Sequence, residues 1–153
     1  MRRIVLTGLF LLLAVPGVAS AAQLIDRNAT GVKIAVNAKG EALFTYKKSD
    51  GIHRVLVWGA INAIAPKEGG HQQKFKLDYS GGWGSRHTLY WKKFGSTCKR
   101  YDGPALANLV AACKAPDGSY WAAQSWPQPL PNLGFTPWDA ATRAQWLEVS
   151  HWT

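Results

Sequence analysis

The sequence predicts a mainly β fold: an antiparallel meander sheet or a small sandwich or barrel, with one or two short helices. Apolar and polar residues alternate in several short segments, as in strands that bury one face. Turns rich in glycine, asparagine and aspartate separate these segments. The segment 74–79 is the clearest case, because Phe75, Leu77 and Tyr79 occupy one face and only charged residues occupy the other. A sheet with one face in water is typically antiparallel, so we expect that arrangement.

Residues 1–21 have the composition of a secretory signal peptide. Arg2 and Arg3 give a cationic start, residues 4–18 are almost entirely apolar, and Ala19-Ser20-Ala21 has the small residues that a signal peptidase recognises. The apolar run of about 15 residues is shorter than the roughly 20 that span a membrane, although an uncleaved anchor is the alternative. We therefore expect a secreted, extracytoplasmic protein with no membrane span after cleavage, and a single β-rich domain over residues 22–153.

Residues 32–58 predict a three-stranded meander. Valine and isoleucine alternate with lysine and alanine over residues 32–36, and residues 42–46 and 54–58 predict the second and third strands. The turns between them are Asn37-Ala38-Lys39-Gly40 and Ser49-Asp50-Gly51.

The second half of the chain predicts further strands and one helix. Thr88–Phe94 and Tyr120–Trp126 are aromatic-rich candidate strands. Four prolines and a glycine over residues 127–137 predict an extended loop. The cap, proline and acidic residue from Thr136 predict a helix to about Gln145, and the alternation from Trp146 onward predicts a last strand.

Cys98 and Cys113 are the two cysteines of the chain, and we expect them to form a disulfide. An even number of cysteines in an exported protein is typical of a disulfide framework, with free thiols or an intermolecular bridge as the alternatives. Between them, Pro104 and the apolar face of residues 105–112 predict a short helix. No further ligands lie at the usual spacing beside either cysteine, so we expect no metal site, and no cofactor motif is present.

The expected mature chain is cationic and rich in tryptophan. The full sequence has 18 Lys and Arg against 9 Asp and Glu; cleavage after residue 21 removes Arg2 and Arg3 but no acidic residue, which leaves 16 against 9, a net charge of +7. All 8 tryptophans lie after residue 21. Tryptophan is large and amphipathic, so these side chains serve either the core or a contact surface for sugars and other flat apolar groups.

Four phrases carry a family resemblance: "LDYSGGWG", "CKAPDGSYWAAQSW", "LPNLGF" and "VSHWT". They resemble exported proteins of high-GC Gram-positive bacteria to which no function is assigned. The resemblance implies a secreted bacterial origin and a sequence that continues past Thr153, and it supplies no active site. The chain also stops at Thr153 within a predicted strand, so we expect that the sequence is a piece of a longer protein.

Catalytic motifs are scarce. The glycine-rich stretch Ser80–Ser85 predicts a flexible hairpin loop that lifts Trp83 into solvent beside Arg86 and His87. A serine hydrolase built from Ser80 or Ser85 with His87 and Asp78 is conceivable, but no sequence pattern fixes these residues together. Glu148 is the carboxylate that remains as a candidate partner in glycoside cleavage.

Two functions of different classes follow. The first is non-catalytic binding to an anionic envelope polymer or glycan, through a stretch in which aromatic and basic residues interleave: Trp83, Arg86, Tyr90, Trp91, Lys92 and Lys93. In the structural alternative, Tyr90 or Trp91 faces the core, and Lys92 and Lys93 only solvate a strand end. The second function is a small exported hydrolase with part of its site beyond residue 153. Aromatic and basic residues also suit nucleic acid, but export makes nucleic acid an unexpected partner.

Overall fold

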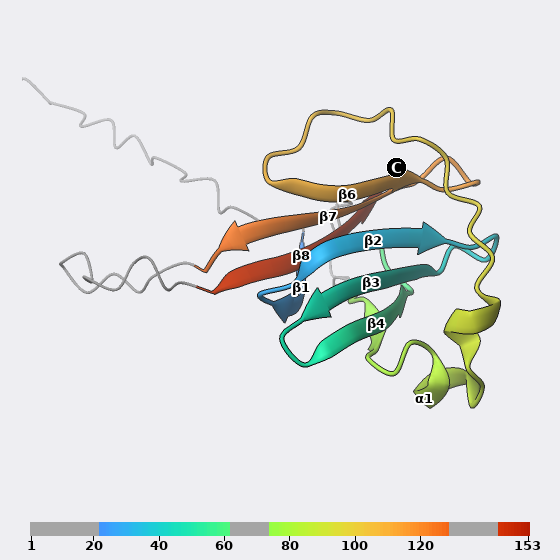
Figure 1. Ribbon diagram of the computed structural model, residues 1–153. Helices are drawn as coiled ribbons and strands as arrows, with labels where there is room; N and C mark the ends of the chain where they lie inside the picture. The colour runs from blue at the N-terminus through green and yellow to red at the C-terminus, as the bar shows by residue number, and fades with distance from the viewer. Residues whose placement is uncertain (1–21, 62–73, 129–143) are drawn as a thin grey trace, which may run out of the picture.

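The chain folds as two four-stranded antiparallel sheets that pack face to face (Figure 1). The computed structural model describes residues 22–61, 74–128 and 144–153. Sheet I has the strand order β1 (Gln23–Arg27), β8 (Gln145–Trp152), β7 (Tyr120–Pro127) and β6 (Leu109–Lys114). Sheet II has the order β2 (Thr30–Val36), β3 (Ala42–Lys48), β4 (Gly51–Trp58) and β5 (Lys76–Asp78). The predicted mainly β, antiparallel class is confirmed, in the form of a sandwich.

Most predicted strands are confirmed where the structure describes them. The meander is β2–β3–β4, in which Ile34 pairs with Phe44 and Phe44 with Val55, so the apolar positions of three strands align on one face. β7 and β8 match the strands predicted at residues 120–126 and from residue 146. The predicted signal peptide at residues 1–21, most of the loop predicted over 127–137 and most of the helix predicted over 136–145 lie outside the described residues.

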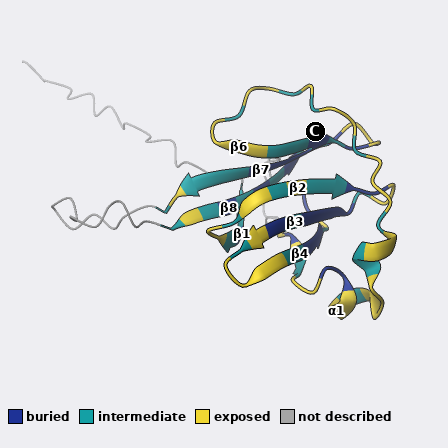
Figure 2. Cartoon of the chain, in the orientation of Figure 1, coloured by how far each residue is buried: buried dark blue, intermediate teal, exposed yellow. Residues whose placement is uncertain are grey.

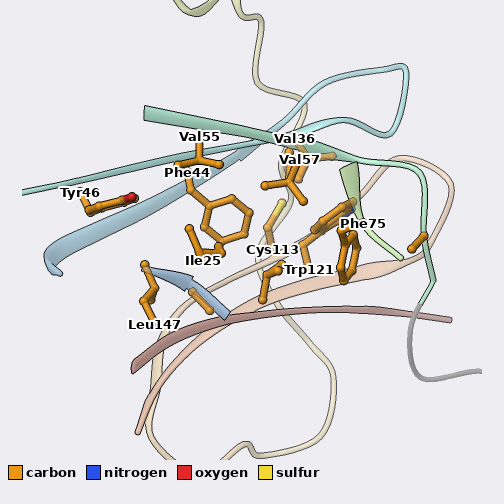
Figure 3. Packing of buried hydrophobic residues seen from close by; sticks show 14 of the residues in the cluster. Ile25, Val36, Phe44, Tyr46, Val55, Val57, Phe75, Cys113, Trp121 and Leu147 are labelled. Atoms are coloured by element: carbon orange, nitrogen blue, oxygen red, sulfur yellow. The ribbon is translucent and has the colours of Figure 1, made fainter. Parts of the chain in front are cut away.

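The core fills the space between the two sheets (Figure 3). Trp121 on β7 is fully buried, and its ring centroid lies 5.7 Å from that of Phe75, which precedes β5. Sheet II adds alternate residues of its meander, such as Phe44 and Val55, and the first part of β3, residues 42–44, is buried throughout (Figure 2). Burial of these large side chains removes apolar surface from water, which is the main force that holds the sheets together.

A buried polar chain lies beside Trp121. The imidazole of His151 on β8 stacks on the indole, with ring centroids 3.9 Å apart. Its Nδ1 lies 2.6 Å from the carbonyl oxygen of Ala60, and its Nε2 lies 2.9 Å from Oγ of Ser119. Ser119 in turn donates from Oγ to Asp117 at 2.6 Å. Burial lowers the pKa of His151, because it disfavours the charged imidazolium.

The predicted disulfide between Cys98 and Cys113 is present, and the side chain of Cys113 lies in the core. The helix predicted over residues 105–112 is wrong, because Leu109–Lys114 is strand β6 and pairs with β7. Asn108 has a φ of 53°, a left-handed conformation that a continuous right-handed helix does not contain. Pairing with β7 satisfies the backbone of this segment, so tertiary structure overrides a short helical pattern.

Residues 79–108, which we call the crossover segment, lead from β5 in sheet II to β6 in sheet I. The segment begins with two short helices, α1 (Trp83–Arg86) and the 3-10 helix η1 (Tyr90–Lys93). The strand predicted at Thr88–Phe94 is therefore wrong, and so is the hairpin loop predicted before it. Further along, Thr97 donates from its backbone N–H to the carbonyl of Val36 at 2.7 Å, which fixes the crossing beside the end of β2.

Two carboxylates hold the first part of the crossover segment. Asp78 accepts hydrogen bonds from the hydroxyls of Ser80 and Ser85 and from their backbone N–H groups. Burial alone would raise the pKa of Asp78, but these donors outweigh it and lower the pKa to about 2. The carboxylate therefore stays ionised and fixes the turn from β5 into α1.

Glu41 is the second carboxylate, and its residue is only 5% exposed. Its Oε2 accepts from the hydroxyl of Tyr90 at 2.6 Å and from the amide of Asn37 at 2.7 Å, and its Oε1 pairs with the guanidinium of Arg86. Burial alone would raise the pKa of Glu41, but the donors Tyr90, Asn37 and Arg86 outweigh it, so the pKa lies below its ordinary value. Glu41 thus ties α1 and η1 to the start of β3.

The disulfide should contribute roughly 3 kcal/mol to the free energy of unfolding, because it closes a loop with a sequence separation of 15 residues. Cys98→Ala breaks the bridge but leaves Cys113 in the core, so urea unfolding of this variant isolates the effect of the bridge from that of packing. Alkylation of the non-reduced wild type followed by mass spectrometry checks the starting state. Two alkylated thiols in the wild type would contradict the prediction.

Glu41→Gln should lower the free energy of unfolding by roughly 2 kcal/mol, because it weakens three hydrogen bonds to a buried charge. The pKa of Glu41 is lower in the folded protein than its ordinary value of 4.5. Its contribution to stability is therefore present above about pH 4.5 and is lost as the pH falls below that value. Thermal melts from about pH 7 to pH 3 should show a shallower loss of stability in the variant than in the wild type.

The matched control is Asp50→Asn. Asp50 is an exposed carboxylate whose partner is the neighbouring His53 on the surface, so its removal should change stability little. Equal losses in the two variants would show that the buried cluster around Glu41 has no special weight.

Candidate binding surface

The six residues that the sequence predicts as a binding site all lie on α1 and η1 of the crossover segment. Gly81 and Gly82, which precede α1, let the chain pack closely against η1 and β4. A Cβ atom at Gly82 would lie 2.7 Å from Cβ of Tyr90, and one at Gly81 would lie 2.9 Å from Cβ of Arg54 on β4. Both glycines also have positive φ, so no other residue fits easily at either position. The structure thus brings the six residues onto one compact unit.

This unit covers the outer face of sheet II. Leu43 and Leu56 pair across β3 and β4 and point away from sheet I, yet both are buried. Arg54 lies two residues from Leu56 on the same face of β4 and is the residue that contacts Gly81 and Trp91. We therefore attribute the burial of both leucines to the crossover segment. The surface it presents is supported by a small second core.

Three of the six predicted residues are engaged in internal contacts. Arg86 and Tyr90 bind Glu41, as described above. The indole of Trp91 has the guanidinium of Arg54 above it, with Cζ 4.0 Å from the ring centroid. These contacts give Arg86, Tyr90 and Trp91 a structural role, because they position the unit on the sheet.

The other three predicted residues, Trp83, Lys92 and Lys93, are exposed. Trp83 is 52% exposed, which is unusual for so large an apolar side chain. Lys92 lies beside Trp91, with Nζ 5.4 Å from the ring centroid. The arrangement places an open indole face and two cations on a unit that Arg86 and Tyr90 hold in place.

The serine-hydrolase alternative has the wrong geometry. The hydroxyls of Ser80 and Ser85 both donate to Asp78, and Ser80 Oγ also accepts from the backbone N–H of Gly84 at 2.6 Å. In the described part of the chain, His87 makes no hydrogen bond to either serine or to Asp78. A nucleophile needs an adjacent base, so this group is a structural turn and not a catalytic one.

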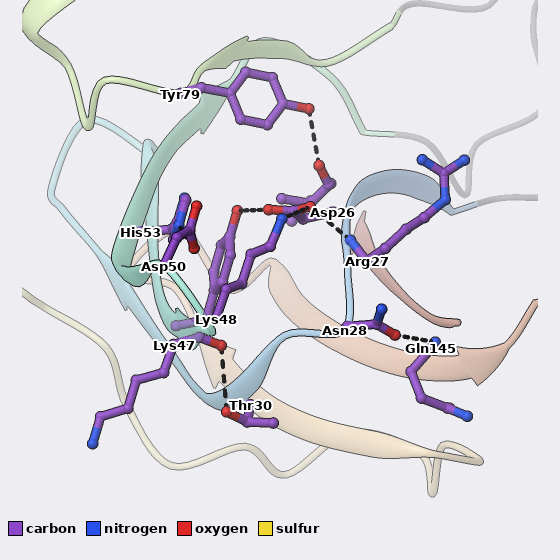
Figure 4. Close-up of polar contacts among 12 residues, drawn as sticks. Asp26, Arg27, Asn28, Thr30, Lys47, Lys48, Asp50, His53, Tyr79 and Gln145 are labelled. Atoms are coloured by element: carbon purple, nitrogen blue, oxygen red, sulfur yellow. Dashed lines mark hydrogen bonds and ion pairs between the residues drawn. The ribbon is translucent and has the colours of Figure 1, made fainter. Parts of the chain in front are cut away.

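The described carboxylates are satisfied within the protein, with one exception. Asp26 is typical, because it accepts from the hydroxyl of Tyr46 at 2.7 Å and from Nζ of Lys48 at 2.9 Å (Figure 4). Burial would raise the pKa of Asp26, but these donors outweigh it and lower the pKa. The exception is Glu148 on β8, which makes no hydrogen bond or ion pair with a described residue; burial raises its pKa.

The basic residues have the opposite distribution. Ten of them are exposed and form no ion pair with a described residue: Arg27, Lys33, Lys39, Lys47, Lys74, Lys76, Lys92, Lys93, Lys99 and Arg100. Because the carboxylates are used internally, the outward charge of the described protein is mainly positive.

Two residues seat the unit on sheet II, Glu41 and Arg54, and the sequence does not predict this role for either. Both are far from it in the chain, since Glu41 is 45 residues from Arg86 and 49 residues from Tyr90. The one hint in the sequence is local: Glu41 lies between a turn and an apolar strand, where a buried carboxylate would need hydrogen-bond donors. Arg54 gives no such hint.

The described residues contain no group of three or more His, Cys, Asp and Glu that could hold a metal ion. In the same part of the chain, no helix has the length and apolar character needed to cross a membrane. A disulfide is typical of extracytoplasmic proteins, and the bridge between Cys98 and Cys113 is consistent with that location. No family model, curated protein or solved structure matches the chain. The resemblance to exported bacterial proteins therefore stays a prediction.

Proposed function

We propose that this protein is a secreted, non-catalytic domain that binds an anionic polymer or glycan of the cell envelope through the surface of α1 and η1. The observation that carries the proposal is the exposure of Trp83 on α1 and of two lysines without ion pairs on η1, within one unit fixed by Glu41. The signal-like residues 1–21 and the disulfide support an extracytoplasmic place of action.

The residues of the surface have different roles in this proposal. Lys92 and Lys93 attract phosphate or carboxylate groups, while the open face of Trp83 stacks on a sugar ring or another flat group. Arg86, Tyr90 and Trp91 act through position, because their own polar and aromatic groups already have partners. No described residue favours the alternative of a small exported hydrolase with part of its site beyond residue 153.

The two binding terms differ in their response to salt. Exposed charges are screened over roughly 8 to 10 Å at physiological ionic strength, so binding by lysines alone should weaken as salt rises. Stacking is a short-range contact and should not weaken. A salt series on purified cell walls can therefore separate the lysines from Trp83.

Lys92→Ala with Lys93→Ala should weaken binding at low salt by about tenfold and flatten its salt dependence. Trp83→Ala should weaken binding by about fivefold at every salt concentration. The measurement is a pull-down on purified cell walls from low to high salt.

Two control variants match these changes. Lys33→Ala with Lys47→Ala removes the same charge from strands β2 and β3, and Ile52→Ala removes an exposed apolar side chain from β4. Neither should affect binding as strongly as its counterpart. If Trp83→Ala sharply lowers the melting temperature, Trp83 is structural and the surface is wrong; if the wild type does not bind cell walls at low salt, the proposed function is wrong.

A further inference from the structure

A second surface, on the outer face of sheet I, combines two tryptophans with two charged groups, Arg27 and Glu148, that form no ion pair with a described residue. Leu147, Val149 and His151 of β8 are buried, so the residues that alternate with them point outward. On this outer face Trp126 pairs with Trp146 across β7 and β8, and Gln124 pairs with Glu148 one step along. We call these four residues and Arg27 the β7–β8 platform.

The two indoles form the floor of the platform. Trp126 and Trp146 stand directly opposite each other on neighbouring strands, and both are partly exposed. Directly opposite residues of an antiparallel pair have Cβ atoms about 4.5–5.5 Å apart. Two indoles at that spacing on a sheet make a broad apolar floor rather than a closed cage.

A donor and an acceptor flank this floor. Arg27 on β1 pairs with Trp146 and places its guanidinium over that ring, with Cζ 5.7 Å from the centroid. Figure 4 shows the same guanidinium turned away from the Asp26 cluster. Glu148 is two residues from Trp146 on the same face and is the described carboxylate that has no hydrogen bond or ion pair.

The charges narrow the class of ligand. An anionic ligand would be repelled by Glu148, and an ammonium ligand over Trp146 would meet the guanidinium of Arg27. A neutral ligand with several hydroxyl groups meets neither charge unfavourably. Its hydroxyls can donate to Glu148 and accept from Arg27, while the flat C–H face of a sugar ring covers an indole.

We propose that the β7–β8 platform is a binding subsite for an uncharged pyranose unit of a glycan, separate from the surface of α1 and η1. Trp126 and Trp146 support the ring, Glu148 accepts from adjacent hydroxyls, and Arg27 donates. Gln124 is less available, because its amide already donates to the carbonyl of Ala107 at 2.7 Å. The subsite binds and does not hydrolyse, because β7 and β8 carry no second carboxylate on this face.

The test uses the purified chain and soluble oligosaccharides in isothermal titration, at about 0.5 M salt to screen the exposed lysines. The neutral probes are tri-N-acetylchitotriose and cellotetraose; the charged probes are chitosan trimer and trigalacturonate. At least one neutral probe should bind, and more tightly than either charged probe. Tighter binding of a charged probe, or no binding of neutral probes up to about 10 mM, would overturn the proposal.

The variants test the platform itself. Glu148→Gln keeps the shape of the side chain, and we expect binding about tenfold weaker with no loss of melting temperature, because the carboxylate has no internal partner to lose. Trp126→Leu keeps an apolar side chain but removes the flat face, and should weaken binding by about tenfold as well. Ile52→Ala, which removes an exposed apolar side chain from β4 in sheet II, should leave the affinity unchanged. Unchanged affinity in both platform variants would overturn the proposal.

Discussion

A carboxylate that is buried in a cationic protein has to be surrounded by donors, and the position of Glu41 decides where the crossover segment lies. Its donors Arg86 and Tyr90 come from two short helices that have little stability alone, since a single helical turn makes too few backbone hydrogen bonds to persist in water. Once the ion pair forms, Trp91 lies under Arg54, and the paired leucines of β3 and β4 lose their contact with water. Glu41, directly before β3, thus fixes the position of α1, and with it the exposed position of Trp83.

The sandwich divides its aromatic residues between three environments. Trp121 lies in the core against Phe75, Trp91 lies between a sheet and a covering segment, and Trp83 faces water. Charged residues are divided as well, because most described carboxylates have partners within the protein, whereas most described lysines are exposed and form no ion pair. A protein of this kind is attracted to polyanions at long range, and its selectivity then depends on the short-range contacts of its exposed aromatic rings.

The parts of the fold that follow from local pattern could be predicted from the sequence. The alternation of apolar and polar residues over 32–36 directly indicates a strand with one buried face, so the sequence predicts the meander correctly. The apolar face at residues 105–112 suggested a helix, but the pairing of β6 with β7 is a long-range property that a local pattern does not carry. The strand predicted over Thr88–Phe94 is wrong for the same reason. This aromatic segment contains the helix η1, which packs on a sheet and does not pair with a strand. At the candidate site, the exposure of the lysines could be predicted. The anchoring by Glu41 could not, because its partners Arg86 and Tyr90 are 45 and 49 residues away in the chain.

In the buried polar chain of His151, Ser119 and Asp117, the number of protons available for hydrogen bonds depends on whether the imidazole is neutral or charged. A carbonyl oxygen only accepts, so Nδ1 of His151 carries the proton that faces Ala60. When the imidazole is neutral, Nε2 is an acceptor, and the single hydroxyl proton of Ser119 then faces two acceptors, Nε2 and the carboxylate of Asp117. An imidazolium would give every contact its own proton, but burial opposes the charge. The interior of the sandwich therefore balances the hydrogen bonds of this chain against desolvation, and desolvation prevails, so His151 takes up a proton less readily than an ordinary histidine.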